Sequence, residues 1–327
     1  MLSLRKVLSL LALAAGLAIA GNASAQVYPT RPIAMIVPVP PGGVLDPVAR
    51  ILAERMRVSL GQPIVVENIP GAGGSIGVDR VARSNPDGYT LSIGNWLTHV
   101  GASATHPVRY DVLTAFAPVS LLTHSPFWLV SRKNFPATNL GELIAWLKSN
   151  PDKALAGTVG PASAAHLCAV YFQQRTGTRF QLIPFRGGGP AIQNVITGHV
   201  DFMFGDVATS VAYLRSGQIR AFSVLAKSRS FAAPNVQTVD ELDLPGLHFS
   251  FWQALWVPRG TPREIVAKLN AAVVEAINDP VTRQRITGLG HEVFPRDQLT
   301  PETLGSFHKA ETEKWWPIIR AANIAAK

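Results

Sequence analysis

Residues 33–46 read IAMIVPVPPGGVLD, and this stretch decides the fold. The run 33–37 is short and apolar and is ended by a proline, which indicates a buried β-strand. Pro41-Gly42-Gly43 then forms a turn, and apolar residues recur at helical spacing over 44–60. A buried strand that enters a helix through a glycine-rich turn is the first half of a β-α-β unit.

The same alternation of β-rich runs and amphipathic helical patterns continues along the chain, which favours an α/β fold. The further expected strands are 64–66, 89–93, 127–130, 154–158, 182–185, 200–204 and 219–225. The further expected helices are 75–82, 140–148, 164–175, 191–197 and 262–278, the last with Thr261 as its N-cap. The sequence therefore predicts two β-α-β units followed by a mainly helical C-terminal part.

The length of the chain indicates two domains, because about 300 residues exceed the size of most single domains. No Gly/Ser-rich or charged linker divides the chain, so we expect extended strands to cross between the domains near 117–123 and 249–257. The C-terminal helices then return to the first domain. The predicted limits are 26–123 plus 250–327 for domain I and 124–249 for domain II.

The N-terminus has the features of a secretory signal peptide. Arg5 and Lys6 precede an apolar run over 8–20, and Ala23-Ser24-Ala25 is a small-x-small cleavage site. The apolar run is shorter than the ~20 residues that span a bilayer. We therefore expect export of the chain and cleavage after Ala25.

Charge and cysteine content narrow the class of partner. Removal of Arg5 and Lys6 lowers the net charge from +9 to +7. Lysines and arginines are scattered and form no dense basic run with aromatic residues, so no nucleic-acid partner is expected, whereas a modest positive field favours an anionic ligand. Cys168 is the only cysteine, which excludes an intramolecular disulfide, and its apolar neighbours predict a buried, inert thiol.

Four glycine-rich junctions lie between an expected strand and an expected helix, at 41–43, 70–77, 157–163 and 185–191. The free N–H groups of a first helical turn bind anions, and a carboxylate is the simplest anion to fit. The glycine spacing matches neither a dinucleotide-binding fingerprint nor a P-loop. The alternative interpretation is that these glycines only allow the chain to enter a helix.

Several polar or aromatic residues near these junctions are candidate ligand contacts. The hydroxyls of Thr158 and Ser163 belong to the third junction. Asp206 follows a strand and could contact a ligand or serve as a helix N-cap. Trp96 follows the third strand and could line a cleft or lie in the core, and Arg186 could pair with a carboxylate or remain solvated.

Enzymatic patterns are weak. The chain has no Gly-x-Ser-x-Gly or His-Glu-x-x-His motif, and its eight histidines lack metal-ligand spacing. Ser163 and His166 lie one helical turn apart, but an N-cap serine and a packed histidine explain them better than a nucleophile and a base. We expect no catalytic residues, no bound metal and no cofactor.

A set of short motifs, in this order and spacing, is specific as a group. They are Tyr28-Pro29-x-Arg31-Pro32, Pro41-Gly42-Gly43-x-x-Asp46, Val66-Glu67-Asn68, Pro70-Gly71-Ala72-Gly73-Gly74, Pro86-Asp87-Gly88-Tyr89-Thr90, Ser163-x-x-His166-Leu167, Pro184-Phe185-Arg186-Gly187, Gly198-x-Val200-Asp201, Gly260-Thr261-Pro262, Leu269-Asn270 and Ala322-Asn323-Ile324. With these motifs the chain resembles the Bug family of periplasmic binding proteins, the receptors of tripartite tricarboxylate transporters.

The resemblance implies a type II periplasmic-binding-protein fold, in which two α/β domains are joined by two hinge strands. It also implies a monomeric periplasmic receptor that captures a small carboxylate between its domains and delivers it to a membrane permease. In this family the first glycine-rich loop holds a carboxylate through backbone amides and water, and the second domain meets the other end of the ligand. The ligand-binding residues implied in this way are Pro41, Gly42, Gly43, Asp46, Trp96, Thr158, Ser163 and Asp206.

Three residues depart from the family pattern. Pro161 removes an N–H donor from the third junction, and Pro40 stiffens the first loop. Trp96 is large for its position, so an aromatic or longer acid that stacks on this residue is an alternative to a small dicarboxylate. Two other functions stay open, namely a receptor that presents its ligand to a sensor kinase and a secreted hydrolase that uses Ser163.

Overall fold

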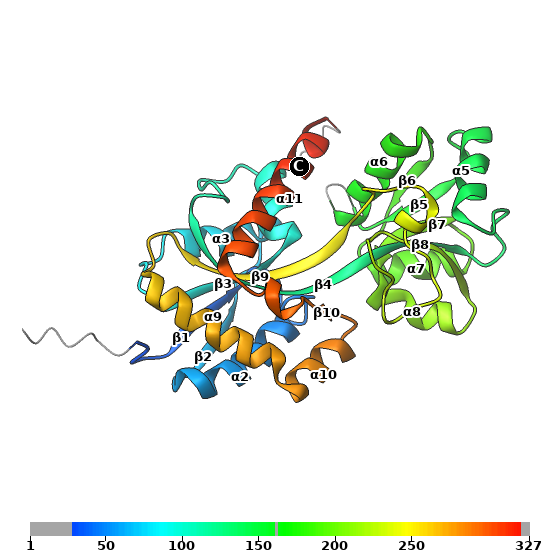
Figure 1. The fold of residues 1–327 in the computed structure, drawn as a ribbon. Helices are drawn as coiled ribbons and strands as arrows, with labels where there is room; N and C mark the ends of the chain where they lie inside the picture. The colour runs from blue at the N-terminus through cyan, green and yellow to red at the C-terminus, as the bar shows by residue number, and fades with distance from the viewer. Residues whose placement is uncertain (1–27, 161–162, 322–327) are drawn as a thin grey trace, which may run out of the picture.

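A computed structural model describes residues 28–160 and 163–321 of the chain, so the predicted signal peptide, Pro161-Ala162 and Ala322-Asn323-Ile324 lie outside the described residues. These residues contain ten strands, of which eight form one path in the order β2-β1-β3-β9-β4-β7-β5-β6, while β8 and β10 lie off this path and each pair with β4. Figure 1 shows that the path divides between two lobes, with β4 and β9 running from one to the other. The expected α/β class is confirmed.

The first lobe contains β1 to β3, β10 and six helices. Its strands are β1 (Ile33–Val37), β2 (Ile64–Asn68), β3 (Thr90–Asn95) and β10 (Glu292–Val293). Its helices are α2 (Asp46–Leu60), α3 (Ser75–Ala82), α4 (Ala102–Thr105), α9 (Arg263–Asn278), α10 (Pro280–Gly288) and α11 (Pro301–Ala321). In Figure 1, α2 and α9 lie on one side of the sheet and α3 and α11 on the other.

The second lobe repeats the alternation on a smaller scale. Its strands are β5 (Leu155–Thr158), β6 (Gln181–Pro184), β7 (Phe202–Asp206) and β8 (Ile219–Val224). Its helices are α5 (Leu140–Ser149), α6 (Ala164–Thr176), α7 (Gly188–Ile196) and α8 (Val207–Arg215). The strands β5, β6 and β7 are parallel to one another, so their carboxyl ends and the helix starts that follow them meet at one edge of the sheet.

The lobes are connected by β4 (Phe116–Arg132) and β9 (Ser250–Pro258), which pair in antiparallel fashion. The first part of β4 pairs with β9, and its last part pairs with β7 and β8 in the second lobe. The sequence predicts a crossing near 117–123 and a separate strand at 127–130, whereas the structure has one strand of 17 residues. Pro126, which has no N–H to donate, lies at the end of the pairing with β9 and does not interrupt the strand.

Two helix ends can be compared with the residues expected to terminate them. The helix α2 ends at Gly61, whose φ of 69° is readily adopted only by glycine. The prediction of Thr261 as the N-cap of α9 is wrong, because Pro262 occupies that position and the Thr261 hydroxyl donates to the carbonyl of Pro258 at 2.8 Å. Cys168 is buried, as expected, and burial raises the pKa of its thiol.

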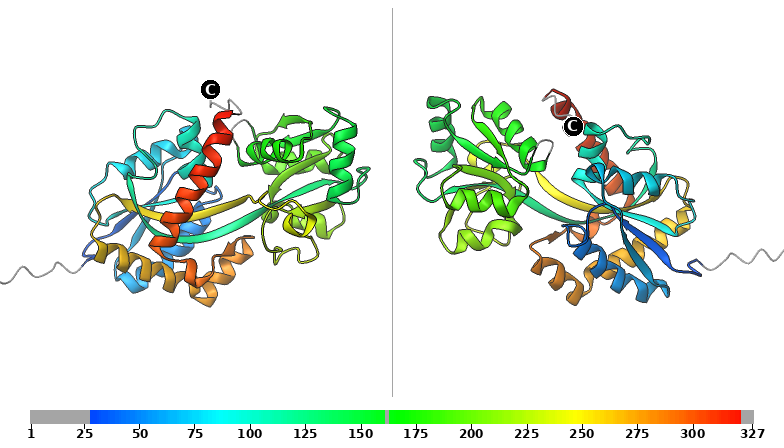
Figure 2. Two further views of the ribbon diagram at one scale, coloured as in Figure 1. Left: turned by 45° about the horizontal axis from the view of Figure 1, so that its top comes forward. Right: turned by 180° about the vertical axis from the view of Figure 1, so that it is seen from behind.

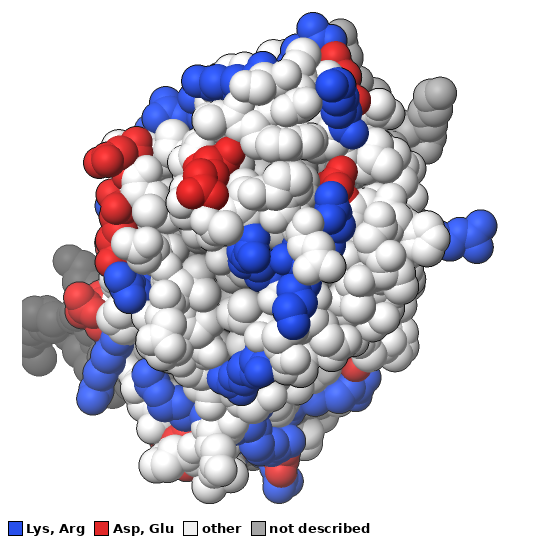
Figure 3. All heavy atoms as spheres, turned by 90° about the vertical axis from the view of Figure 1, so that its right-hand side faces the viewer, with Lys and Arg blue, Asp and Glu red and all other residues white. Residues whose placement is uncertain are grey.

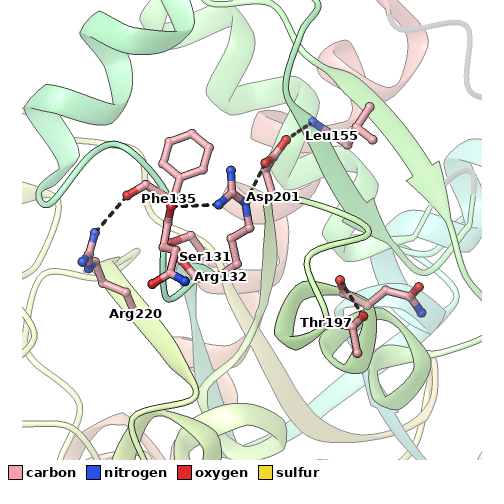
Figure 4. A network of polar contacts seen from close by, with 9 residues as sticks. Ser131, Arg132, Phe135, Leu155, Thr197, Asp201 and Arg220 are labelled. Carbon is pink, nitrogen blue, oxygen red and sulfur yellow. Dashed lines mark hydrogen bonds and ion pairs between the residues drawn. The ribbon is translucent and has the colours of Figure 1, made fainter.

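One half-buried acid, Asp201, links the strands of the second lobe (Figure 4). Asp201 accepts a hydrogen bond from Arg132 Nε at 2.9 Å and one from the backbone N–H of Leu155 at 2.9 Å. Arg132 also donates to the carbonyl of Asn134 at 2.8 Å. This carboxylate therefore links the end of β4, the start of β5 and the start of β7.

No helix in the part of the chain that the structure describes is long and apolar enough to cross a membrane.

The buried histidines make the fold sensitive to acid. Burial lowers the pKa of His124, His291 and His308 to about 4. Between that value and the ordinary pKa of about 6.5, the unfolded chain binds protons that the folded chain does not. The folded chain therefore has its full free energy of unfolding above about pH 6.5 and loses part of it as the pH falls from there towards about 4. Burial raises the pKa of Glu292 and Glu311, which offsets part of the loss.

We predict that the free energy of unfolding falls when the pH is lowered from 7 to 5, by roughly 1–2 kcal/mol per buried histidine before the offset. Urea denaturation at the two pH values measures the change. The variant His124→Gln should show a smaller fall than the unmodified chain. A free energy of unfolding that is equal or higher at pH 5 would contradict the prediction.

Candidate ligand-binding site

A cavity of about 400 Å³ lies between the two lobes. Figure 2 shows the backbone of the lobes from two further sides. The cavity is lined by Gly42, Gly43, Val44, Pro47, Leu97, Ser125, Phe127, Val159, Ser163, Ala164, Ala165, Gly188, Met203, Phe204, Gly205, Asp206, Thr209, Phe251, Leu289 and His291. Both lobes and both crossing strands contribute to this lining. Most of the side chains are apolar, and the polar ones lie at the helix starts and on the crossing strands.

The N-terminal ends of four helices meet at this cavity. The lining includes the residues before and within the first turn of α2, and the first residues of α6, α7 and α8. Each helix start carries unpaired backbone N–H groups and the positive end of the helix dipole. The described residues that line the cavity include no Lys or Arg. The attraction for an anion therefore comes from the backbone.

The positive side chains lie elsewhere. Figure 3 shows the outer face of the second lobe, where lysines and arginines are spread among uncharged and acidic residues. Among the described residues that line the cavity, Asp206 is the one acidic residue. The net positive charge of the chain thus contributes a long-range field, but it supplies no charged partner inside the cavity.

The first glycine-rich loop lies at the cavity, but its hydrogen bonds differ from the expectation. The N–H of Gly42 donates to Asp46 Oδ2 at 3.0 Å, and the N–H of Gly43 donates to the carbonyl of Pro40 at 3.0 Å. Neither glycine N–H is therefore available to a ligand in this geometry. The N–H of Val44 has no hydrogen-bond partner among the described residues. The donor that this loop offers to a carboxylate is accordingly one residue later than the two glycines.

Asp46 contacts the loop and not the cavity, since it is 5% exposed and is not among the residues that line the cavity. Its carboxylate accepts from Gly42 N, from Asn68 Nδ2 at 3.0 Å and from Arg50 Nε at 3.1 Å. Burial raises the pKa of Asp46, but these hydrogen bonds outweigh it and hold the pKa below its ordinary value. Asp46 is therefore ionised and fixes the loop, which has φ +75° at Gly42.

Ser163 and Asp206 line the cavity from the second lobe and are both helix N-caps. The Ser163 hydroxyl accepts from His166 N at 3.2 Å and donates to the carbonyl of Gly160 at 2.7 Å. The carboxylate of Asp206 accepts from Thr209 N at 2.9 Å. The N-cap interpretation of both residues is confirmed, and each side chain fixes a helix start at the cavity wall.

Trp96, Thr158 and Pro41 are not among the residues that line the cavity. Trp96 is fully buried, and its ring packs against Phe249 and Trp315 with centroid distances of 5.2 and 5.6 Å. It presents no face on which an aromatic acid could stack.

Thr158 is 1% exposed, and Pro41 is exposed. Leu97, which follows Trp96, and Val159, which follows Thr158, line the cavity instead.

The lining includes residues that sequence reasoning did not select. Ser125, Phe127 and Phe251 come from the crossing strands, and Leu289 and His291 come from the segment between α10 and β10. The only signal in the sequence was the position of 117–123 and 249–257 as crossings. Within the described residues, no group of three or more His, Cys, Asp or Glu side chains is placed to hold a metal ion.

We predict that Asp46→Ala destabilises the first lobe by roughly 1–3 kcal/mol, because it leaves the N–H of Gly42 and the amide of Asn68 without their acceptor. The midpoint of urea denaturation measures the effect. Asp79→Ala is the control, since Asp79 is a surface partner of Arg83 and such pairs contribute about 0–1 kcal/mol. Equal effects of the two substitutions would show that Asp46 does not hold the loop.

Comparison with known proteins places the chain in a family. Residues 48–324 match the model of the tripartite tricarboxylate transporter family receptor. Protein BugT of Bordetella pertussis is 36% identical over 311 residues, which cover 94% of each chain.

Two solved structures share the fold. MatC from Rhodopseudomonas palustris with bound malate is 37% identical, with a TM-score of 0.73 over 89% of this chain and 100% of that chain. A TctC solute-binding protein from Polaromonas without ligand is 27% identical, with a TM-score of 0.80 over 90% of this chain and 99% of that chain. These matches confirm the fold of periplasmic binding proteins. The chain belongs to the family of receptors of tripartite tricarboxylate transporters, which are periplasmic solute-binding proteins.

Proposed function

We propose that this protein captures a small organic carboxylate in the cavity between its lobes and delivers it to the permease of a tripartite tricarboxylate transporter. The observation that carries the proposal is the meeting of four helix N-termini at a mainly apolar cavity that contains no Lys or Arg. Backbone N–H groups and helix dipoles bind a carboxylate without a charged side chain. Delivery to a permease rests on membership of the family.

The lining also favours one placement of the acid. Val44 N and the first turn of α6, at Ala164 and Ala165, offer N–H donors on opposite sides of the cavity. In this placement the carboxylate binds between α2 and α6, and the apolar walls hold the carbon skeleton. A cavity of about 400 Å³ suits a small acid, and the related MatC has malate bound.

In this proposal the chain has two domains, 26–123 plus 250–327 and 124–249, which close over the ligand by bending β4 and β9. Two observations support closure. The apolar residues Val44 and Leu289 line the cavity but are 51% and 40% exposed, and closure would cover their side chains. The TM-score is 0.80 with the relative solved without ligand and 0.73 with the one that has malate bound.

The proposal includes export and excludes catalysis. Cleavage after Ala25 would release the chain into the periplasm, where the family acts. A hydrolase that used Ser163 would need a base beside the hydroxyl, but that hydroxyl donates to the carbonyl of Gly160. No feature of the described residues favours presentation of the ligand to a sensor kinase.

The test introduces a negative charge into the cavity. Gly188 lines the cavity, and a Cβ at this position would meet no atom within 4 Å, so Gly188→Asp fits without a clash. We predict that isothermal titration of the unmodified chain against dicarboxylates, hydroxy acids and aromatic acids finds a micromolar ligand. We also predict that Gly188→Asp weakens the binding of this ligand at least tenfold, because like charges repel in a site shielded from water.

Two controls separate charge from shape. Gly188→Asn has almost the same shape without the charge and should bind nearly as tightly as the unmodified chain. Gly189→Asp adds the same charge one residue away, where the backbone is exposed and outside the lining, and should have little effect. Absence of any carboxylate ligand for the folded chain, or equal loss in the Asp and Asn variants at position 188, would overturn the proposal.

A further inference from the structure

The crossing strands place three residues of the cavity in one row. In the antiparallel pairing of β4 with β9, Ser125 lies opposite Phe251. In the pairing of β10 with β4, Glu292 lies opposite His124 and Val293 opposite Thr123. Continuing that register by one residue places His291 opposite Ser125. Residues opposite one another on neighbouring strands project from the same face of the sheet, and all three of these residues line the cavity.

Two polar atoms of this row are buried without a partner. Ser125 is 1% exposed and His291 is 6% exposed. Neither Ser125 Oγ nor His291 Nδ1 has a hydrogen-bond partner among the described residues. Nearly all buried polar groups in folded proteins have such a partner, and an unpaired one is costly. Two unpaired atoms on adjacent residues of the same cavity floor therefore indicate a partner that enters through the cavity.

The charges around this row select the kind of partner. Burial lowers the pKa of His291 and His124 to about 4, so both rings are neutral at pH 7. Glu292 is adjacent in sequence, accepts from Ser230 Oγ at 2.9 Å and lies 3.9 Å from His124 Nε2. A second carboxylate would find no cationic side chain among the described residues that line the cavity. An uncharged group that both donates and accepts hydrogen bonds fits a serine hydroxyl and a neutral imidazole.

We propose that Ser125 and His291 form a second polar subsite, which binds an uncharged hydrogen-bonding group of the captured acid, in the simplest case a hydroxyl. The inference rests on the proposed function, because the carboxylate of the same ligand binds at the helix N-termini. The subsite determines specificity. It makes the protein a receptor for a hydroxylated organic acid, since an acid without the hydroxyl leaves both buried atoms unpaired.

The test compares acids that differ by one hydroxyl. Two such pairs are malate and succinate, and 4-hydroxybenzoate and benzoate, each titrated into the mature chain by calorimetry. We expect the unmodified protein to bind the hydroxylated member of at least one pair about tenfold or more tightly than its partner. Ser125→Ala and His291→Phe should each remove most of that preference, measured as the ratio of the affinities for the two members of a pair. His291→Gln, which keeps a donor and an acceptor, should retain part of it.

The matched control is Ser223→Ala. Ser223 is also a buried serine on a strand that pairs with β4, and its Oγ also has no partner among the described residues, but it does not line the cavity. This variant should keep the full preference. A chain that binds carboxylates with no preference for the hydroxylated member, or whose preference survives both Ser125→Ala and His291→Phe, overturns the subsite alone. A folded chain that binds no acid of either pair and no other carboxylate overturns the proposed function as well.

Discussion

The pairing of β4 with β9 is the constraint on which the rest of the structure depends. These two strands belong to the sheet of the first lobe, and β4 continues into the sheet of the second. Since backbone hydrogen bonds fix the register of the pair, they also fix which residues form the floor of the cavity. The same strands are the connection about which the lobes would close, so ligand contact and domain movement involve the same segments.

An aromatic cluster packs next to the crossing strands β4 and β9. Phe249 lies just before β9 and contacts Trp96, Trp315 and Phe127, with ring centroids 5.2, 4.8 and 4.7 Å away. Phe127 faces the cavity, while Trp315 comes from α11 and also contacts Tyr171 of the second lobe. Trp96 therefore contributes to the site through packing. Such edge-to-face pairs favour one arrangement of the lobes without a direct contact to the ligand.

The electrostatics of the cavity follow from the backbone more than from side-chain charge. Helix starts supply the donors, and the side chains at these starts are used to hold them in place: Asp46 in α2, Ser163 in α6 and Asp206 in α8. In the proposed function, this use of backbone donors explains how a chain with many scattered basic residues binds a carboxylate without a basic side chain. It also makes the choice of ligand depend on loop shape and on the few polar atoms that the helix starts leave unused.

Local patterns predicted the fold well and the site in part. Strand β1 and helix α3 have the expected limits, because periodicity and glycine turns are local signals. The sequence also located the loop at Gly42 and Gly43 and the caps at Ser163 and Asp206. It selected Trp96 and Thr158 where Leu97 and Val159 line the cavity, because the direction of a side chain changes from one residue to the next.

Ser125 and His291 could not be predicted in this way. Their adjacency arises from a register between segments that lie far apart in the sequence. The N–H groups of Gly42 and Gly43 were likewise expected to be free, but Asp46 and the carbonyl of Pro40 accept their hydrogen bonds. Both features depend on contacts that only the folded chain defines.

A crystal structure of the complex with the tightest-binding acid of the carboxylate panel tests the central claim most directly. The account predicts one carboxylate within hydrogen-bond distance of the N–H groups of Val44 and of the first turn of α6, and no contact between the ligand and a lysine or arginine side chain. A ligand bound outside the interlobe cavity, or a carboxylate paired with a basic side chain, would contradict it.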